Sequence, residues 1–288
     1  MSHTQFPQRL TTTNHERDNA GMAYVYPVVS RRAAGVSVGI NLNPNNACNW
    51  ACIYCQVPNL VRGAAPAIDL PILEGELRSL LDDIFHGDFM QKHVPENMRR
   101  LNDIALSGNG EPTSSKRFSE VIELIGHIKR ELGLMGKTKL VLITNGSLMD
   151  RPRVQSGLRK MAELDGEVWF KLDSATTNGL RRINQTRTSP EKHFERLKIS
   201  AALCPTWIQT CMFAFDNEPP SMAEQDAYLA FVQRTQQEKL AIKGVLLYGL
   251  ARPSLQPGAE RLSALSEEWL EHFAERIHKA GLPCKVSA

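Results

Sequence analysis

The segment CNWACIYC, residues 48–55, places three of the chain's six cysteines within eight positions. It follows closely on VSVGINL (36–42), a short run rich in β-branched residues that predicts a strand. Cysteine thiolates three or four residues apart can converge on a metal centre. The alternative, three buried thiols without a ligand, is disfavoured because the asparagine-rich stretch 41–46 is a poor apolar environment. The segment therefore predicts a metal-binding loop directly after a strand.

Strand-like and helix-like segments alternate along the rest of the chain. Five further runs predict strands, at residues 102–108, 138–146, 166–174, 206–215 and 241–251. Apolar residues at helical spacing predict helices at residues 70–90, 114–132, 151–164, 189–204 and 221–239, and one helix or two over 257–282. Six βα units of this kind predict parallel strands with right-handed helical crossovers, in a partial barrel or an open sheet. In both folds ligands bind at the carboxyl ends of the strands, where the cysteines lie.

The composition is that of a globular protein without a membrane span. Apolar residues make up 42% and charged residues 23% of the chain, and no apolar run approaches the ~18 residues of a transmembrane helix. The first 22 residues are polar and lack the apolar core of a signal peptide, so we expect a cytoplasmic protein. We expect a loose or surface-laid segment over 1–22 and a single domain over 23–288. The net charge of +3 is weak evidence for a nucleic-acid partner.

The number of cysteines in the loop limits the kind of metal centre. A closed zinc site takes four ligands and a bacterial ferredoxin run needs a fourth nearby cysteine, but Cys204, Cys211 and Cys284 are dispersed. Those three are expected to be small buried residues. Three thiolates on a four-iron cluster would leave one iron with an open coordination position, which chemistry requires. A zinc-dependent hydrolase with an open fourth position and a metal-bearing scaffold without turnover remain alternatives.

Two motifs together resemble those of the radical S-adenosylmethionine (radical SAM) enzymes. They are the CxxxCxxC spacing of Cys48, Cys52 and Cys55, and SGNGEPT (107–113), which ends the second strand where that family carries a GGE motif. The resemblance implies an α/β fold, a partial (βα)6 TIM-type barrel of parallel strands with outer helices. It also implies an oxidoreductase in which the three cysteines hold one 4Fe–4S cluster, and the open iron chelates S-adenosyl-L-methionine. Reductive cleavage of that cofactor would yield a 5′-deoxyadenosyl radical, which abstracts hydrogen from a substrate.

The SGNGEPT motif supplies the first cofactor contacts that the resemblance implies. Asn109, Gly110 and Glu111 would take the methionine end of S-adenosylmethionine. Glycine lets the backbone approach a ligand closely, and a carboxylate accepts hydrogen bonds from a cationic amino group. An ordinary glycine turn is the alternative for this motif.

Further cofactor contacts are implied at the ends of the third and fourth strands. Asn145, Lys171 and Asp173 would take the carboxylate and the ribose of the cofactor. Tyr54, before the last cysteine of the loop, completes the cofactor-binding candidates. A turn asparagine at position 145 and a structural ion pair between Lys171 and Asp173 are the alternatives.

Longer matches point to one branch of the family. YVYPVVSRRAAGVSVGINLNP (24–44) and LYGLARPS (247–254) resemble segments of the wyosine-forming tRNA synthases, and the likeness runs over most of residues 23–285. Archaeal members of that branch carry a second cluster on upstream cysteines, whereas no cysteine precedes Cys48 here. No second cluster is therefore predicted, and the substrate is left open between a small molecule and tRNA. A flavodoxin or ferredoxin is the expected electron donor.

The segments after the fifth and sixth strands provide candidates for substrate binding. These candidates are Asp216, Glu218, Tyr248 and Arg252. An arginine at a barrel mouth suits a carboxylate or a phosphate, although pairing with a loop carboxylate is equally consistent with the sequence. Cys211 on the fifth strand could donate a hydrogen atom to a radical, but packing is the simpler interpretation.

Overall fold

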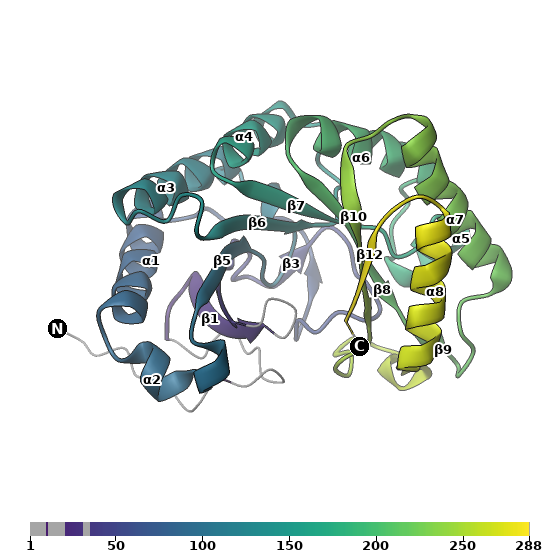
Figure 1. The fold of residues 1–288 in the computed structure, drawn as a ribbon, viewed down its shortest axis with the longest axis horizontal. Coiled ribbons are helices and arrows are strands. Elements are labelled where there is room, and N and C mark those ends of the chain that lie inside the picture. Colours follow the sequence, from purple (N-terminus) through teal and green to yellow (C-terminus); the bar gives the residue numbers. More distant parts are fainter. Residues whose placement is uncertain (1–9, 11–20, 31–34, 288) are drawn as a thin grey trace.

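The computed structural model describes residue 10 and residues 21–30 and 35–287. Its centre is an eight-stranded sheet with the strand order β1-β2-β5-β6-β7-β8-β10-β12. These strands span Val25–Ser30, Gly35–Ile40, Leu101–Leu106, Lys139–Thr144, Gly166–Lys171, Thr206–Met212, Ile242–Gly249 and Cys284–Ser287. Every neighbouring pair is parallel except β1 and β2. The sheet curves into an incomplete barrel with helices on its outer side, which confirms the predicted fold (Figure 1).

Six of the eight strands are the ones that the sequence predicts, and the other two lie at the edges of the sheet. The predicted strands correspond to β2, β5, β6, β7, β8 and β10, in that order across the sheet. β1 joins one edge antiparallel, and β12 joins the other edge parallel. β1 contains Pro27, which an edge strand tolerates because one side of its backbone needs no ladder partner.

Helices connect the strands and cover the outer face of the sheet (Figure 1). Helices α1 to α8 span Leu70–Phe85, Phe89–His93, Phe118–Glu131, Pro152–Glu163, Thr177–Ile183, Pro190–Leu203, Met222–Gln237 and Glu267–Lys279. Side-chain caps fix several starts: the hydroxyl of Ser189 accepts from the amide of Lys192, and Pro190 occupies the first turn. Short strands β3 (Ala47–Cys48), β4 (Val61–Arg62), β9 (Ala214–Phe215) and β11 (Leu262–Ser263) lie in the loops.

Two helical predictions differ from the structure, and one helix of the structure has no prediction. The helix predicted over 70–90 is divided into α1 and α2, because Gly87 and Asp88 are poor helix formers. The helix predicted over 257–282 starts only at Glu267, where Ser266 caps it, after a 3₁₀ turn and β11. α5 was not predicted, since seven residues are too few for a periodic apolar pattern.

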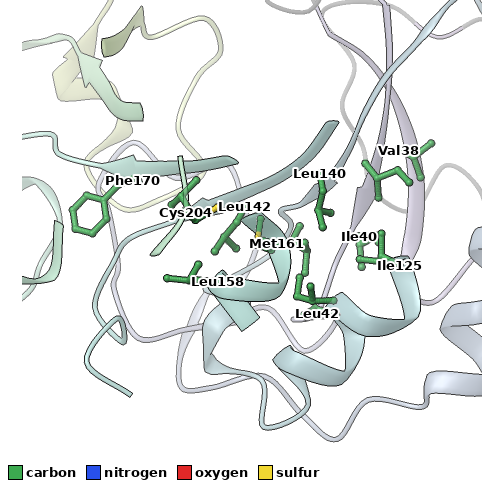
Figure 2. Packing of buried hydrophobic residues seen from close by; sticks show 14 of the residues in the cluster. Val38, Ile40, Leu42, Ile125, Leu140, Leu142, Leu158, Met161, Phe170 and Cys204 are labelled. Atoms are coloured by element: carbon green, nitrogen blue, oxygen red, sulfur yellow. The ribbon is translucent and has the colours of Figure 1, made fainter. Parts of the chain in front are cut away.

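The main hydrophobic core lies between the sheet and its helices. Figure 2 shows Leu140 and Leu142 of β6 among Ile125 of α3 and Leu158 and Met161 of α4. All five side chains are fully buried. Alternate residues of a strand point to one face, so the same spacing that puts Leu140 and Leu142 outward turns their neighbours into the barrel. Each buried side chain of this size stabilises the fold by ~1.5–3 kcal/mol.

The N-terminal segment is described at few positions. Leu10 is buried in the main core, and its amide donates to the carbonyl of His93 over 2.8 Å, so this residue is not loose. The rest of the segment expected over 1–22, apart from Gly21 and Met22, lies outside the described residues. The division into a segment and one domain stays a prediction. In the described part of the chain no helix is both long and apolar enough to cross a membrane.

Candidate functional site

The cysteine loop, residues 48–57, lies at the carboxyl ends of the strands, and α5 fixes one side of it. The amide of Ala51 donates to the carbonyl of Asn184 over 3.3 Å. The amide of Ile53 donates to the carbonyl of Ile183 over 2.9 Å. These two backbone bonds flank Cys52 in the sequence, so the end of α5 sets the position of that cysteine.

The segment after β10, residues 252–256, fixes the opposite side of the cysteine loop. The hydroxyl of Ser254 donates to the carbonyl of Ile53 over 2.6 Å. The side-chain amide of Gln56 donates to the carbonyl of Arg252 over 3.2 Å. The structure therefore places Arg252, a predicted substrate contact, in a strap that holds the cysteine loop, and its role toward a substrate stays a prediction.

The loop after β6 provides a third attachment. Asn145 Nδ2 donates to Asn49 Oδ1 over 2.8 Å, and Asn49 Nδ2 donates to Ser147 Oγ over 2.7 Å. Asn145 Nδ2 also lies 4.0 Å from the sulfur of Cys48. Asn145 thus lies beside the first cysteine, and its contact with a cofactor stays a prediction.

The SGNGEPT turn packs directly against the stretch that precedes Cys48. Asn109 donates through its amide to Asn41 Oδ1 over 3.0 Å and through Nδ2 to Asn46 Oδ1 over 2.6 Å. A Cβ atom at Gly110 would overlap the carbonyl oxygen of Ala47. Glycine is therefore required here for contact between two loops, and a cofactor contact at this turn is an additional role that stays a prediction.

The three cysteines are half-buried and none forms a disulfide. Burial raises the pKa of Cys48 and of Cys52 to about 12. Metal ligation needs thiolates, so loading these cysteines with iron would release protons. The shortest side-chain contact to one of these sulfurs is from Asn184 Nδ2 to Cys52, at 3.3 Å.

The donor set consists of soft thiolates. Among the described residues, no three histidine, cysteine or acidic side chains form a group that could hold a metal ion. In an iron–sulfur cluster each cysteine binds a different iron, so the sulfurs need not meet at one point. Three soft thiolate donors on one ordered loop, with no fourth cysteine in it, agree with a cluster that keeps one iron accessible.

Glu111 lies deep between β5 and β6, with 2% of its surface exposed. Its Oε1 accepts from the amide and hydroxyl of Thr113 and from the hydroxyl of Thr144, over 3.2, 2.6 and 2.6 Å. Its Oε2 accepts from the amide of Asn145 over 2.7 Å. Burial raises the pKa of Glu111, and these hydrogen bonds oppose that rise. The carboxylate ties the ends of two strands together, and Oε2 retains capacity for one more donor.

A polar network links the cysteine loop to the inner face of the barrel. The hydroxyl of Tyr54 donates to Asp173 Oδ2 over 2.6 Å. Lys171 Nζ donates to the hydroxyls of Tyr54 and Tyr248, over 3.1 and 3.4 Å. Asp173 Oδ1 accepts from the amide of Cys211 over 3.0 Å. Lys171 and Asp173 thus share a face, as predicted, and they are joined through Tyr54.

Lys171 remains a cation inside this network. Burial by itself would lower the pKa of Lys171, but the acidic groups around it, Tyr248 and Asp173 foremost, raise it well above its ordinary value. A buried ammonium that stays charged needs anionic partners, and Asp173 is the nearest carboxylate in the network. The same charge can attract a carboxylate of a bound ligand.

A cavity of about 410 Å³ opens at the carboxyl ends of β7 and β8, between α5 and the start of α7. Its walls include Asp173, Cys211, Phe213, Arg182 and Glu218. The volume lies in the range of small-molecule sites, about 300–1,000 Å³. The cavity therefore brings together one predicted cofactor contact, Asp173, and one predicted substrate contact, Glu218.

The other predicted substrate residues have different surroundings. Asp216 forms a two-point ion pair with Arg261 at the surface, and the Arg261 guanidinium lies 4.1 Å from the centre of the Phe215 ring. This pairing lowers the pKa of Asp216. Asp216 therefore pairs with Arg261 beside the β9–β11 ladder. Of the two predicted substrate residues Asp216 and Glu218, only Glu218 borders the cavity. Tyr248 lies in the Lys171 network on the inner face.

Two buried polar residues of the site were not predicted. Asn184 is fully buried at the end of α5, and Gln209 is 3% exposed on β8, opposite Lys171 in register. Within the described residues, Oδ1 of Asn184 and Oε1 of Gln209 have no hydrogen-bond partner. The parity of β8 marks Gln209 as inward-facing, whereas no sequence signal marks Asn184, because α5 itself was missed.

Comparison with curated proteins finds distant relatives. No family model matches the chain. It is 30% identical over 160 residues to a UPF0026 protein of Helicobacter pylori, covering 55% of this chain and 45% of that protein. It is 30% identical over 172 residues to a UPF0026 protein of Synechocystis, covering 58% and 54%. The chain thus matches about half the length of these relatives.

Comparison with solved structures shows which fold this is. A radical SAM methyltransferase from Sphaerobacter thermophilus aligns with a TM-score of 0.59, at 13% identity, over 91% of this chain and 68% of that one. TYW1 with a lysine–pyruvate adduct bound aligns with a TM-score of 0.52, at 14% identity, over 84% and 73%. A mutant of spore photoproduct lyase aligns with a TM-score of 0.52, at 9% identity, over 83% and 73%. The chain has the fold of the radical SAM enzymes, as its cysteine and SGNGEPT motifs predict.

Proposed function

We propose that this protein is a cytoplasmic radical SAM enzyme that binds one 4Fe–4S cluster and cleaves S-adenosylmethionine reductively. The observation that carries the proposal is the placement of three cysteines on one loop over the carboxyl ends of the strands, in this fold. The loop is fixed from three sides by α5, by the strap 252–256 and by Asn145. A rigid loop with one ligand too few for a closed four-iron site suits a catalytic metal centre.

Cys48, Cys52 and Cys55 would hold the cluster. When bound, the cluster would supply the electron that splits the sulfonium of the cofactor, giving a 5′-deoxyadenosyl radical. The single electron would come from a flavodoxin or ferredoxin, which is the partner expected for such a cluster.

In this proposal, different residues around the loop bind different parts of the cofactor. Glu111 Oε2, with Asn109 and Gly110 beside it, accepts from the amino group of the methionine end. The Lys171 ammonium attracts the carboxylate. Asp173 borders the cavity and accepts from three donors, so a carboxylate with about four acceptor positions keeps one for a ribose hydroxyl.

Anaerobic reconstitution with iron and sulfide tests this function. The expected result is about four iron and four sulfide ions per chain, with the visible absorption of a cluster. After chemical reduction, S-adenosylmethionine should be converted to 5′-deoxyadenosine and methionine. Uptake of zinc in place of iron would favour the hydrolase alternative, and a loaded cluster without 5′-deoxyadenosine would favour the scaffold.

The substrate class needs its own experiment, because the two candidates are a small molecule and tRNA. Binding to bulk tRNA at two salt concentrations discriminates between them. Binding that weakens steeply with salt would support a tRNA-modifying enzyme without a second cluster, since released counterions set that slope. Absence of salt-dependent binding would favour a small molecule.

A further inference from the structure

Asn184 contacts a cysteine of the loop and the Asp173 network with the same functional group. Its Nδ2 lies 3.3 Å from the sulfur of Cys52 and 2.7 Å from Asp173 Oδ2. A side-chain amide carries two N–H donors on that nitrogen, one for each partner. Asn184 is fully buried, so water does not compete for either bond.

The orientation of this amide is set by Asp173. The other partners of Asp173 are also donors: the hydroxyl of Tyr54 and the amide of Cys211. Turning the Asn184 amide over would place its oxygen against the acceptor oxygen of Asp173 and lose the 2.7 Å bond. Asp173 therefore keeps the N–H groups of Asn184 directed at Cys52, although Oδ1 is left without a partner among the described residues.

The backbone keeps the distance between Asn184 and Cys52 fixed. The hydrogen bonds of Ala51 and Ile53 to the last residues of α5 bracket Cys52 on both sides. Residue 184 provides both the carbonyl for Ala51 and the amide for the cysteine sulfur. The N–H···S contact thus belongs to the framework that positions the loop.

The three cysteines differ in this respect. Cys48 has side-chain contacts only at 4.0 Å, with Asn49 Oδ1 and Asn145 Nδ2, and a backbone hydrogen bond from Trp50. No side-chain hydrogen bond to the Cys55 sulfur is seen among the described residues. A hydrogen bond to a ligating sulfur draws electron density from it and so favours the reduced, more negatively charged cluster. Such a bond at one cysteine makes its iron electronically distinct from the others.

We propose that Asn184 is a positioning residue that hydrogen-bonds the Cys52 ligand and raises the reduction potential of the bound cluster. The inference deepens the proposed function and rests on it. Asn184 touches neither the accessible iron nor the substrate in this role. It acts through Cys52, and Asp173 maintains its orientation.

The test is the midpoint potential of the reconstituted cluster in Asn184→Leu, measured by EPR-monitored redox titration. Leucine has nearly the same shape as asparagine and no donor. The substitution removes the N–H···S bond to Cys52, together with the hydrogen bond to Asp173. At a fixed solution potential, the ratio of reduced to oxidised cluster is expected to fall roughly tenfold. This corresponds to a decrease of ~59 mV in the midpoint potential for one electron. Tyr54→Phe is the matched comparison, because it removes a donor from Asp173 but leaves Asn184 on Cys52; its shift should be clearly smaller.

The outcomes separate this inference from the proposed function. A wild-type protein that takes up no cluster contradicts the function itself. An unchanged potential in Asn184→Leu with full iron content, or an equal shift in Tyr54→Phe, overturns the role of Asn184 alone.

A measurement on the wild-type protein covers the case in which Asn184→Leu does not retain a cluster. Pulsed EPR of the reduced wild-type cluster, with ¹⁵N-labelled asparagine, should show coupling to a side-chain nitrogen. Absence of that coupling would also overturn the proposal.

Discussion

The two faces of the barrel strands carry different chemistry. Outward, Leu142 of β6 and Phe170 of β7 are fully buried among helices in the main core. Inward, Lys171, Gln209 and Cys211 of β7 and β8 form a polar and sulfur-containing layer beneath the cysteine loop. The outer face is held mainly by apolar packing, with a few hydrogen bonds to the helices such as Thr210 to Tyr228. The inner face depends on hydrogen bonds that cross between strands and loop.

This difference separates stability from function in one element. The apolar outer face contributes the free energy that offsets burial of charged groups on the inner face. The inner face can then hold Lys171 and Asp173 in fixed positions, although burial of these two side chains does not itself stabilise the fold. Mutations on the outer face should therefore lower the stability of the protein, whereas mutations at the inner face and its loop should impair cluster binding.

The largest expected effect is on cluster binding. Cys52→Ala removes one of three proposed ligands, so the reconstituted protein should lose most of its iron and sulfide. Iron and sulfide analysis measures this directly. Cys204→Ala is the matched control: Cys204 is buried on the outer side, its sulfur 3.5 Å from the carbonyl of Gly166, and the variant should keep its iron. Equal iron loss in both variants would mean that the two faces are not separate.

A core truncation on the outer face should act on stability alone. Leu142→Ala should lower the free energy of unfolding by about 2–5 kcal/mol, through lost burial and the cavity left behind. Urea denaturation measures the change. Leu132→Ala, at a half-exposed position, should cost much less. Retention of cluster in folded Leu142→Ala would confirm the separation.

Stability should also depend on the protonation of His193. Burial lowers the pKa of His193 to about 4 from the ordinary 6.5, against the opposing hydrogen bond of its Nε2 to the Lys171 carbonyl. The unfolded chain binds the proton more readily, so the stabilisation is complete above pH 6.5 and is lost as the pH falls toward 4. The loss amounts to about 3 kcal/mol over that window.

The measurement for His193 is urea denaturation at several pH values, with His193→Phe as the control. The variant should lose this pH dependence, since its ring cannot be protonated. Burial also raises the pKa of Asp103 to about 6, so this residue makes both proteins more stable as the pH falls. Subtracting the two pH profiles removes this shared contribution and leaves that of His193. Identical pH profiles would show that His193 is protonated equally in the folded and unfolded states.

Gly110 packs against Ala47, directly before Cys48, so a methyl group there should disturb both folding and the cysteine loop. Gly110→Ala introduces a Cβ that overlaps the Ala47 carbonyl, and overpacking of this kind costs about 1–3 kcal/mol. Gly75→Ala is the control, because a Cβ at that helical position meets no atom within 4 Å. Thermal unfolding and iron content together test this, and a variant with wild-type values of both would contradict the close approach.

The smallest effect is expected at Asp216. Asp216→Asn weakens an exposed ion pair with Arg261, and such pairs contribute little to stability. Thermal unfolding should be unchanged within error, and cluster content should be unaffected. A marked loss of turnover with a wild-type melting curve would restore Asp216 as a substrate contact.

The sequence alone predicted the strands and the cysteine loop well. β-branched runs at regular spacing identified six of the eight main strands, because each is long enough to show its pattern. The edge strand β1 was missed as a strand, since Pro27 and the neighbouring polar residues obscure its alternation. α5 is too short to show a periodic pattern, so the sequence does not predict it. Asn184, at the end of α5, is for the same reason not identified as a site residue.

The sequence fully specifies the chemistry available at the site: three thiols within eight positions, an SGNGEPT turn, and Lys171 and Asp173 two residues apart at the end of a strand. Local spacing suffices for these, because neighbours in the chain have fixed geometry. Which partners these groups have depends on the three-dimensional fold. Glu111 meets Thr144 and Asn145 across two strands, and Cys52 meets an asparagine 132 positions away. Such contacts arise from the closure of the barrel, which brings together strand ends that no local pattern relates.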